Sequence, residues 1–125
     1  MCGFTPFLGN HLRRQTHESA LGLREYYMDK HRLILIVEDT DEDAELLKIA
    51  IRKNGSPNPI HVVQDGREAI DYLCGAGKYS DRQTYPFPGV LFLDLKLPRL
   101  NGFDVLRWLK DHEKCKVIPV MVLTS

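Results

Sequence analysis

The feature that most constrains the fold is an uninterrupted apolar run, Leu33 to Val37, that ends directly in the acidic pair Glu38-Asp39. Such a run is typical of a β-strand buried on both faces, as in a parallel sheet. A second run, Val90 to Leu93, ends in Asp94 in the same way. Two buried strands that each stop at a carboxylate predict an α/β protein with acidic groups at one edge of its sheet.

The segments between these runs predict helices, so strands and helices alternate along the chain. Thr40 or Asp41 can cap the first helix, and Asn54-Gly55 can end it. Further strands are predicted at 60–63 and 117–123, and a long loop at 75–88. The predicted inward residues of the three helices are Ala44, Leu47, Ala50 and Ile51; Ala69, Ile70 and Leu73; and Phe103, Leu106 and Leu109. This order predicts a flavodoxin-like, doubly wound parallel sheet with helices on both faces.

Composition narrows the function classes only slightly. A chain of 125 residues with 43% hydrophobic and 27% charged residues is ordinary for one globular domain. Lys+Arg and Asp+Glu both number 17, so net charge favours neither a nucleic-acid nor a membrane partner. No apolar stretch approaches the roughly 20 residues of a membrane span. The three cysteines form no CxxC pair, which favours a reduced, cytoplasmic setting.

The acids that follow the two strands predict a metal site. In a flavodoxin-like order these strands are neighbours, so Glu38, Asp39 and Asp94 should converge at the carboxyl edge of the sheet. Three carboxylates repel one another unless a cation lies among them, and oxygen ligands favour Mg²⁺. Asp94 could then act as a carboxylate nucleophile. For Glu38 and Asp39 taken alone, simple stabilisation of the next helix's N-terminus is an equally good interpretation.

Three ordered motifs resemble the response-regulator receiver domain of two-component systems. They are Leu35 to Asp39, Leu91 to Pro98 with Gly102, and Pro119 to Ser125. The resemblance covers Leu33 to the end of the chain. The loop at 75–88 is similar to that of a stand-alone subgroup that includes cyanobacterial phytochrome regulators.

The resemblance implies a phosphorylated signalling switch and assigns roles to single residues. Its partner would be a sensor histidine kinase or a phosphotransfer protein, and its cofactor Mg²⁺. The implied roles are: Asp94, phosphoacceptor; Asp39, direct Mg²⁺ ligand; Glu38, a ligand usually acting through water; Lys96, a backbone-carbonyl ligand; Thr124, the hydroxyl that senses the phosphoryl group; and Pro98 and Gly102, the turn that shapes the pocket wall.

The family pattern also continues beyond what this sequence contains. We expect residues 30–125 to form a receiver domain incomplete at its C-terminus, lacking the fifth strand with its lysine and the last two helices. Residues 1–29 are expected to be a mobile N-terminal extension. A fourth strand left at the sheet edge would favour a homodimer. Two other functions stay open: an interaction module that is no longer phosphorylated, and a Mg²⁺-dependent aspartate phosphatase. The phosphatase is the weaker alternative, because Lys96 occupies the position where that class usually has a second acid.

Overall fold

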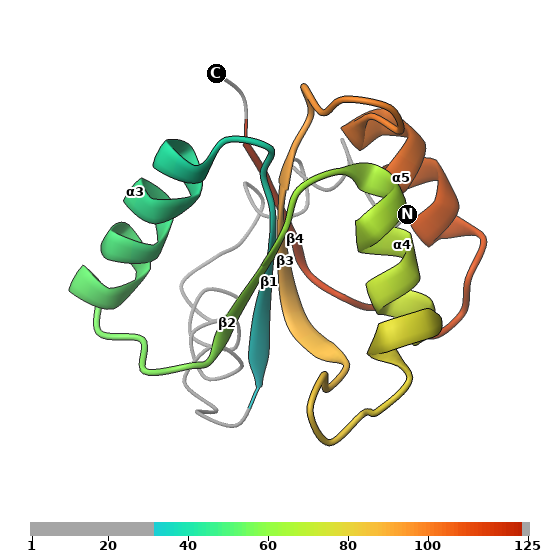
Figure 1. The fold of residues 1–125 in the computed structure, drawn as a ribbon, viewed down its shortest axis with the longest axis horizontal. Coiled ribbons are helices and arrows are strands. Elements are labelled where there is room, and N and C mark those ends of the chain that lie inside the picture. The colour runs from blue at the N-terminus through green and yellow to red at the C-terminus, as the bar shows by residue number, and fades with distance from the viewer. Residues whose placement is uncertain (1–31, 124–125) are drawn as a thin grey trace, which may run out of the picture.

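Residues 32–123 are described by a computed structural model, in which strands and helices alternate as predicted (Figure 1). Their order and bounds are β1 (Leu33–Val37), α3 (Asp41–Lys53), β2 (Ile60–Val63), α4 (Gly66–Cys74), the 3₁₀ turn η1 (Gly77–Tyr79), β3 (Pro88–Asp94), α5 (Gly102–Lys110) and β4 (Val120–Leu123). The predicted N-terminal extension and Thr124 lie outside the described residues.

The four strands form one parallel sheet in the order β2-β1-β3-β4. Strand β1 therefore lies between β2 and β3, and Val37 is in register with both Val63 and Leu93. This confirms the flavodoxin-like order in which β1 and β3 are neighbours. It also brings the residues that follow Val37 and Leu93 to the same edge of the sheet.

Helices cover both faces of the sheet, α3 on one side and α4 with α5 on the other (Figure 1). Every residue of β1 is buried, as expected for a strand covered on both faces. Its alternate side chains enter two cores: Leu33, Leu35 and Val37 pack with α4 and α5, whereas Ile34 and Ile36 pack with Ile51 of α3. The continuous apolar run is thus explained by burial from two directions.

Each helix begins at a side-chain cap that the sequence contains. Thr40 caps α3 by accepting a hydrogen bond from Asp43 N–H at 3.4 Å, and Asp65 caps α4 by accepting one from Glu68 N–H at 2.8 Å. Asn101 begins α5 with a full capping box. These caps satisfy N–H groups that have no partner within the helix, so the helices start next to the carboxyl ends of the strands.

Some predicted details were wrong. Phe103 was predicted to point inward but is 56% exposed, because Val105 and Leu109, one turn apart, face the sheet and are fully buried. Ala50 is likewise exposed. Strand β4 begins only at Val120, after Pro119, which lacks the N–H that a ladder requires.

The long loop between α4 and β3 is more ordered than a sequence rich in glycine and proline suggests. Tyr79 in η1 is only 2% exposed and packs on Tyr72, with ring centroids 4.8 Å apart. Tyr85 contacts the same ring group, and His61 of β2 lies 5.1 Å from the Tyr72 ring. His61 is half-buried in this group of rings. Aromatic packing therefore fixes this loop against the edge strand.

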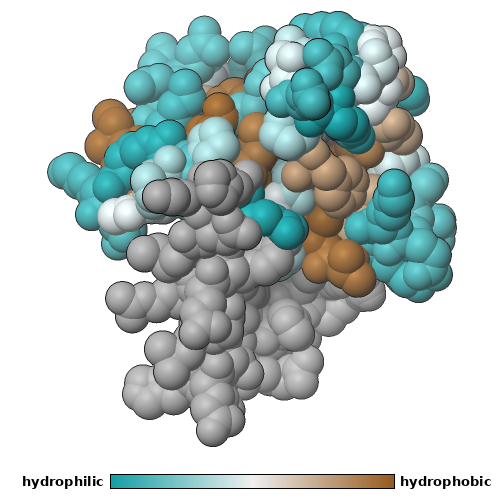
Figure 2. Space-filling model, turned by 90° about the horizontal axis from the view of Figure 1, so that it is seen from below, coloured by the Kyte–Doolittle hydropathy of each residue, from teal (hydrophilic) through white to brown (hydrophobic). Residues whose placement is uncertain are grey.

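On the face shown in Figure 2, hydrophobic residues form several patches with hydrophilic residues between them. Within residues 32–123, no helix combines the length and apolar character needed to cross a bilayer. The cytoplasmic location and the homodimer stay predictions.

Candidate functional site

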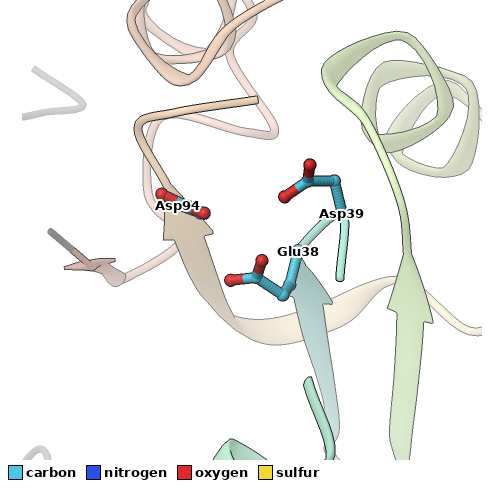
Figure 3. Close-up of side chains that lie close together, drawn as sticks. All are labelled: Glu38, Asp39 and Asp94. Carbon is cyan, nitrogen blue, oxygen red and sulfur yellow. The ribbon is translucent and has the colours of Figure 1, made fainter. Parts of the chain in front are cut away.

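The three carboxylates predicted to converge do so. Glu38 and Asp39 follow β1, Asp94 ends β3, and their side chains point into a shared space at the carboxyl edge of the sheet (Figure 3). One carboxylate oxygen from each residue lies within 4.8 Å of the other two. Glu38 and Asp94 are 6% and 8% exposed, whereas Asp39 is open to solvent. The site is therefore an acidic pocket with one accessible side.

Glu38 shows the electrostatic cost of this arrangement. Its Oε2 accepts hydrogen bonds from Thr40 N–H at 3.3 Å and from the Thr40 hydroxyl at 3.4 Å. Burial nevertheless raises the pKa of Glu38 to about 7, and the negative charge of Asp94 adds to the rise, although the Thr40 N–H opposes it. A positive charge among the carboxylates would relieve this unfavourable interaction.

Asp94 is held at the end of β3 by hydrogen bonds of the two residues that follow it. Its Oδ1 accepts a hydrogen bond from Lys96 N–H at 2.9 Å, which turns the chain immediately after the strand. The next peptide is fixed in turn, because Leu95 N–H donates to Leu123 O at 3.3 Å. The carboxylate thus projects from a defined backbone position, as a nucleophile or metal ligand requires.

Gly102 allows the loop after Asp94 to close tightly. Its N–H donates to Leu95 O at 3.3 Å. A Cβ at this position would lie 2.6 Å from both Asp94 O and Leu95 Cα. Because the neighbouring atoms are backbone, they cannot move aside as a side chain could. Gly102 therefore permits the close backbone approach of the turn after Asp94, while its implied role in the pocket wall stays a prediction.

An open cavity of about 370 Å³ lies over the carboxylates. The residues that line it are Glu38, Asp39, Asp43, Leu47, Asp94, Lys96 and Leu123. Sequence reasoning did not assign Asp43 and Leu47 to the site. A signal was present for these two residues, since Asp43 and Leu47 are spaced four apart in the predicted helix and residues at that spacing share a helix face.

The donor set fits a hard divalent cation. All three carboxylates offer oxygen, two of them from buried positions, and they lie close enough together to share one ion. Mg²⁺ and ions of similar charge prefer such ligands and keep several waters, for which the open side leaves room. Burial and the nearby Asp94 raise the pKa of Glu38, and a cation bound among the carboxylates would favour its ionised form.

Comparison with known proteins places the chain among signalling proteins. Residues 34–125 match the family model of the response regulator receiver domain. The chain is 36% identical over 96 residues to the probable methanogenesis regulatory protein FilR2 of Methanothrix harundinacea, and 33% identical over 94 residues to the response regulator Rcp1 of Synechocystis sp.. These matches cover 74% and 75% of this chain but only 57% and 62% of the relatives.

Solved structures agree with the sequence matches. The bacteriophytochrome response regulator AtBRR is 42% identical, with a TM-score of 0.70, over 76% of this chain and 67% of that one. The phosphorylated cyanobacterial phytochrome response regulator RcpA is 36% identical, with a TM-score of 0.68, over 75% and 65%. The Mn²⁺-bound form of Rcp1 has a TM-score of 0.67 at 33% identity, over 74% and 65%. Members of the phytochrome-regulator type are thus among the similar structures.

Proposed function

Because the chain belongs to the response regulator receiver family, we propose that it is a signalling switch in which Asp94 accepts a phosphoryl group in a Mg²⁺-dependent reaction. The donor would be a phosphohistidine of a sensor histidine kinase or a phosphotransfer protein. The observation that carries the proposal is the convergence of Glu38, Asp39 and Asp94 at the end of neighbouring parallel strands. One relative in this family, RcpA, has been solved in a phosphorylated form.

Asp94 would act as the nucleophile. One of its carboxylate oxygens forms a bond to phosphorus while the P–N bond to the donor histidine breaks. The electron pair of that bond leaves with the imidazole, which takes up a proton. The Lys96 N–H holds Oδ1 at 2.9 Å and orients the carboxylate toward the cavity. Positioning of this kind is the main contribution a protein makes to phosphoryl transfer.

Glu38 and Asp39 would hold the cation together with Asp94 and the Lys96 carbonyl. Bound Mg²⁺ offsets the negative charge that gathers on the carboxylates and the phosphoryl oxygens. The hydroxyl of Thr124 would then hydrogen-bond the phosphoryl group and link phosphorylation to a shift between two conformations. These roles for Lys96 and Thr124 follow from the family pattern.

Incubation with acetyl phosphate and Mg²⁺, followed by intact-mass measurement, tests the proposal. We expect a gain of one phosphoryl group in the natural chain and none in Asp94→Asn. Asp111→Asn is the matched control, since Asp111 is exposed at the end of α5, away from the carboxylates. Chelation of the metal should also prevent the adduct.

Three results would contradict the proposal. Absence of an adduct on the folded chain would favour an interaction module that is not phosphorylated. An adduct that persists in Asp94→Asn would place the phosphoacceptor elsewhere. Steady hydrolysis of small phosphate esters would instead favour a phosphatase that uses the same carboxylate.

A further inference from the structure

The loop after Asp94, residues 95–101, contributes Lys96 to the lining of the carboxylate pocket and has two anchors. The first is local: Lys96 N–H donates to Asp94 Oδ1, and Leu97 enters the core at 8% exposure. The second lies at the far end of the loop, where Arg99 and Leu100 contact the start of α4. This second anchor joins parts of the chain that are far apart in sequence.

Two interactions make the second anchor. Gly66 N–H donates to Leu100 O at 3.1 Å, and the Arg99 guanidinium forms an ion pair and hydrogen bond with Asp65 Oδ2. The contact is close, because a Cβ on Gly66 would lie 2.1 Å from Leu100 O. The loop therefore rests directly on the first turn of α4.

Asp65 is a firm point of attachment. It is 8% exposed and caps α4 through its other oxygen, Oδ1, at 2.8 Å from Glu68 N. Burial alone would raise the pKa of Asp65, but the hydrogen bonds from the Glu68 N–H and the Arg99 guanidinium outweigh it and hold the pKa below its usual range. The carboxylate that receives Arg99 is thus ionised and fixed in place.

Arg99 shows that the loop is held in a conformation its own backbone disfavours. Its φ is +60°, and within the described part of the chain it is the one non-glycine residue with a positive φ. A side chain with a Cβ makes this conformation costly, and it persists only where surrounding contacts impose it. The contacts that hold this part of the loop are those of Arg99 with Asp65 and of Leu100 with Gly66.

We propose that Asp65 and Arg99 are positioning residues, whose ion pair holds the loop at the pocket and thereby strengthens divalent-cation binding and phosphorylation at Asp94. Neither residue lines the cavity, so both act through the loop. The inference rests on the proposed function, because it concerns the cation and the phosphoryl group of that same site.

The test uses the full chain and four variants. Arg99→Ala removes the ion pair and keeps the positive-φ strain, whereas Arg99→Gly removes both. Asp65→Asn keeps a good helix cap but loses the charge. Arg67→Ala is the matched control. It removes an arginine of α4, the helix that Asp65 caps, and the ion pair of this arginine with Asp71 is exposed to solvent. Mg²⁺ affinity is measured by calorimetry, phosphorylation by acetyl phosphate as a function of Mg²⁺, and folding by thermal melting.

We expect Arg99→Ala and Asp65→Asn each to weaken Mg²⁺ affinity by roughly three- to tenfold, as for residues that modulate a site without touching its ligand. The double variant should be no weaker than the worse single one, because both remove the same contact. Arg99→Gly should melt at a higher temperature than Arg99→Ala yet bind Mg²⁺ as weakly. The melting temperature would then rise from Arg99→Ala to Arg99→Gly without a matching gain in Mg²⁺ affinity, which a purely structural role does not predict. Arg67→Ala should match the natural chain.

Unchanged Mg²⁺ affinity in folded Arg99→Ala and Asp65→Asn would overturn the inference while leaving the proposed function intact. Additive losses in the double variant would also overturn it, since the two side chains would then act separately. If the natural chain itself neither binds Mg²⁺ nor gains a phosphoryl group, the proposed function fails and this inference fails with it.

Discussion

Replacing Glu38 by glutamine is expected to stabilise the metal-free protein above neutral pH. The reason is that the folded chain disfavours ionisation of this carboxyl group: burial and the nearby Asp94 raise its pKa from 4.5 to about 7. In the unfolded chain the same group keeps an ordinary pKa of about 4.3. Glutamine has the same shape, carries no charge, and can still accept the hydrogen bond from Thr40 N–H.

The sign and size follow from proton linkage. As pH rises from about 4.5 to 7, the unfolded chain releases the Glu38 proton while the folded chain retains it. This part of the stability is therefore lost across that window and does not return at higher pH. At 1.36 kcal/mol for each pH unit between the two pKa values, the loss is at most about 3 to 4 kcal/mol. Solvent that enters the open pocket screens the charges, so about 1 to 3 kcal/mol is expected at pH 8.

Urea unfolding at several pH values, with chelator present, measures this effect. Glu38→Gln should exceed the natural chain in free energy of unfolding at pH 8, and the difference should shrink toward pH 5. Added Mg²⁺ should stabilise the natural chain more than the variant, because the variant loses a ligand. Glu45→Gln is the control, since Glu45 is exposed on α3 and makes a surface ion pair with Lys48.

Two outcomes would refute the reasoning. If Glu38→Gln is less stable than the natural chain at pH 8, the carboxylate contributes stabilising contacts that outweigh its burial. If the difference does not change between pH 5 and 8, the Glu38 pKa is not raised in the folded chain.

Three further predictions concern the surroundings of the site. Gly102→Ala should lower stability by about 1 to 3 kcal/mol and also weaken Mg²⁺ binding, because its Cβ would lie 2.6 Å from Asp94 O; urea unfolding and calorimetry measure the two effects. Tyr72→Phe should cost about 1 kcal/mol in urea unfolding, because the buried hydroxyl donates to Pro86 O at 2.9 Å; an unchanged midpoint would contradict this. Burial lowers the pKa of His61, so stability should fall as pH drops below about 6.5, where the unfolded chain takes up a proton first; His61→Gln should reduce that slope in melts between pH 7 and 5.

The elements closest to the site were predictable because their signals are local. The bounds of β1 followed from an apolar run that stops at Glu38. The start of α3 was predicted at Thr40 or Asp41, and Thr40 is the residue whose side chain caps the helix. The convergence of Glu38, Asp39 and Asp94 needed one more rule, that neighbouring parallel strands end at the same edge. No knowledge of distant side-chain contacts was required.

Helix faces were predicted less well. In α5, Phe103 and Val105 are both apolar, and the pattern alone could not decide which of them faces the sheet. The choice depends on how the whole helix is rotated, which packing with Leu109 and the sheet decides. Packing with Tyr72 likewise decides that Tyr79, although it lies in the loop between α4 and β3, is more buried than several helix residues.

The sequence by itself therefore determined the order of strands and helices and the convergence of three carboxylates at one edge of the sheet. Only the tertiary structure decided how the loop after Asp94 is held. Asp65 and Arg99 lie 34 positions apart and carry no periodic or motif signal that pairs them. Their contact exists because α4 and the loop after β3 are packed on the same side of the sheet. Contacts of this kind depend on the packing of complete elements, whereas strands, caps and strand-end acids are specified by neighbours in the chain.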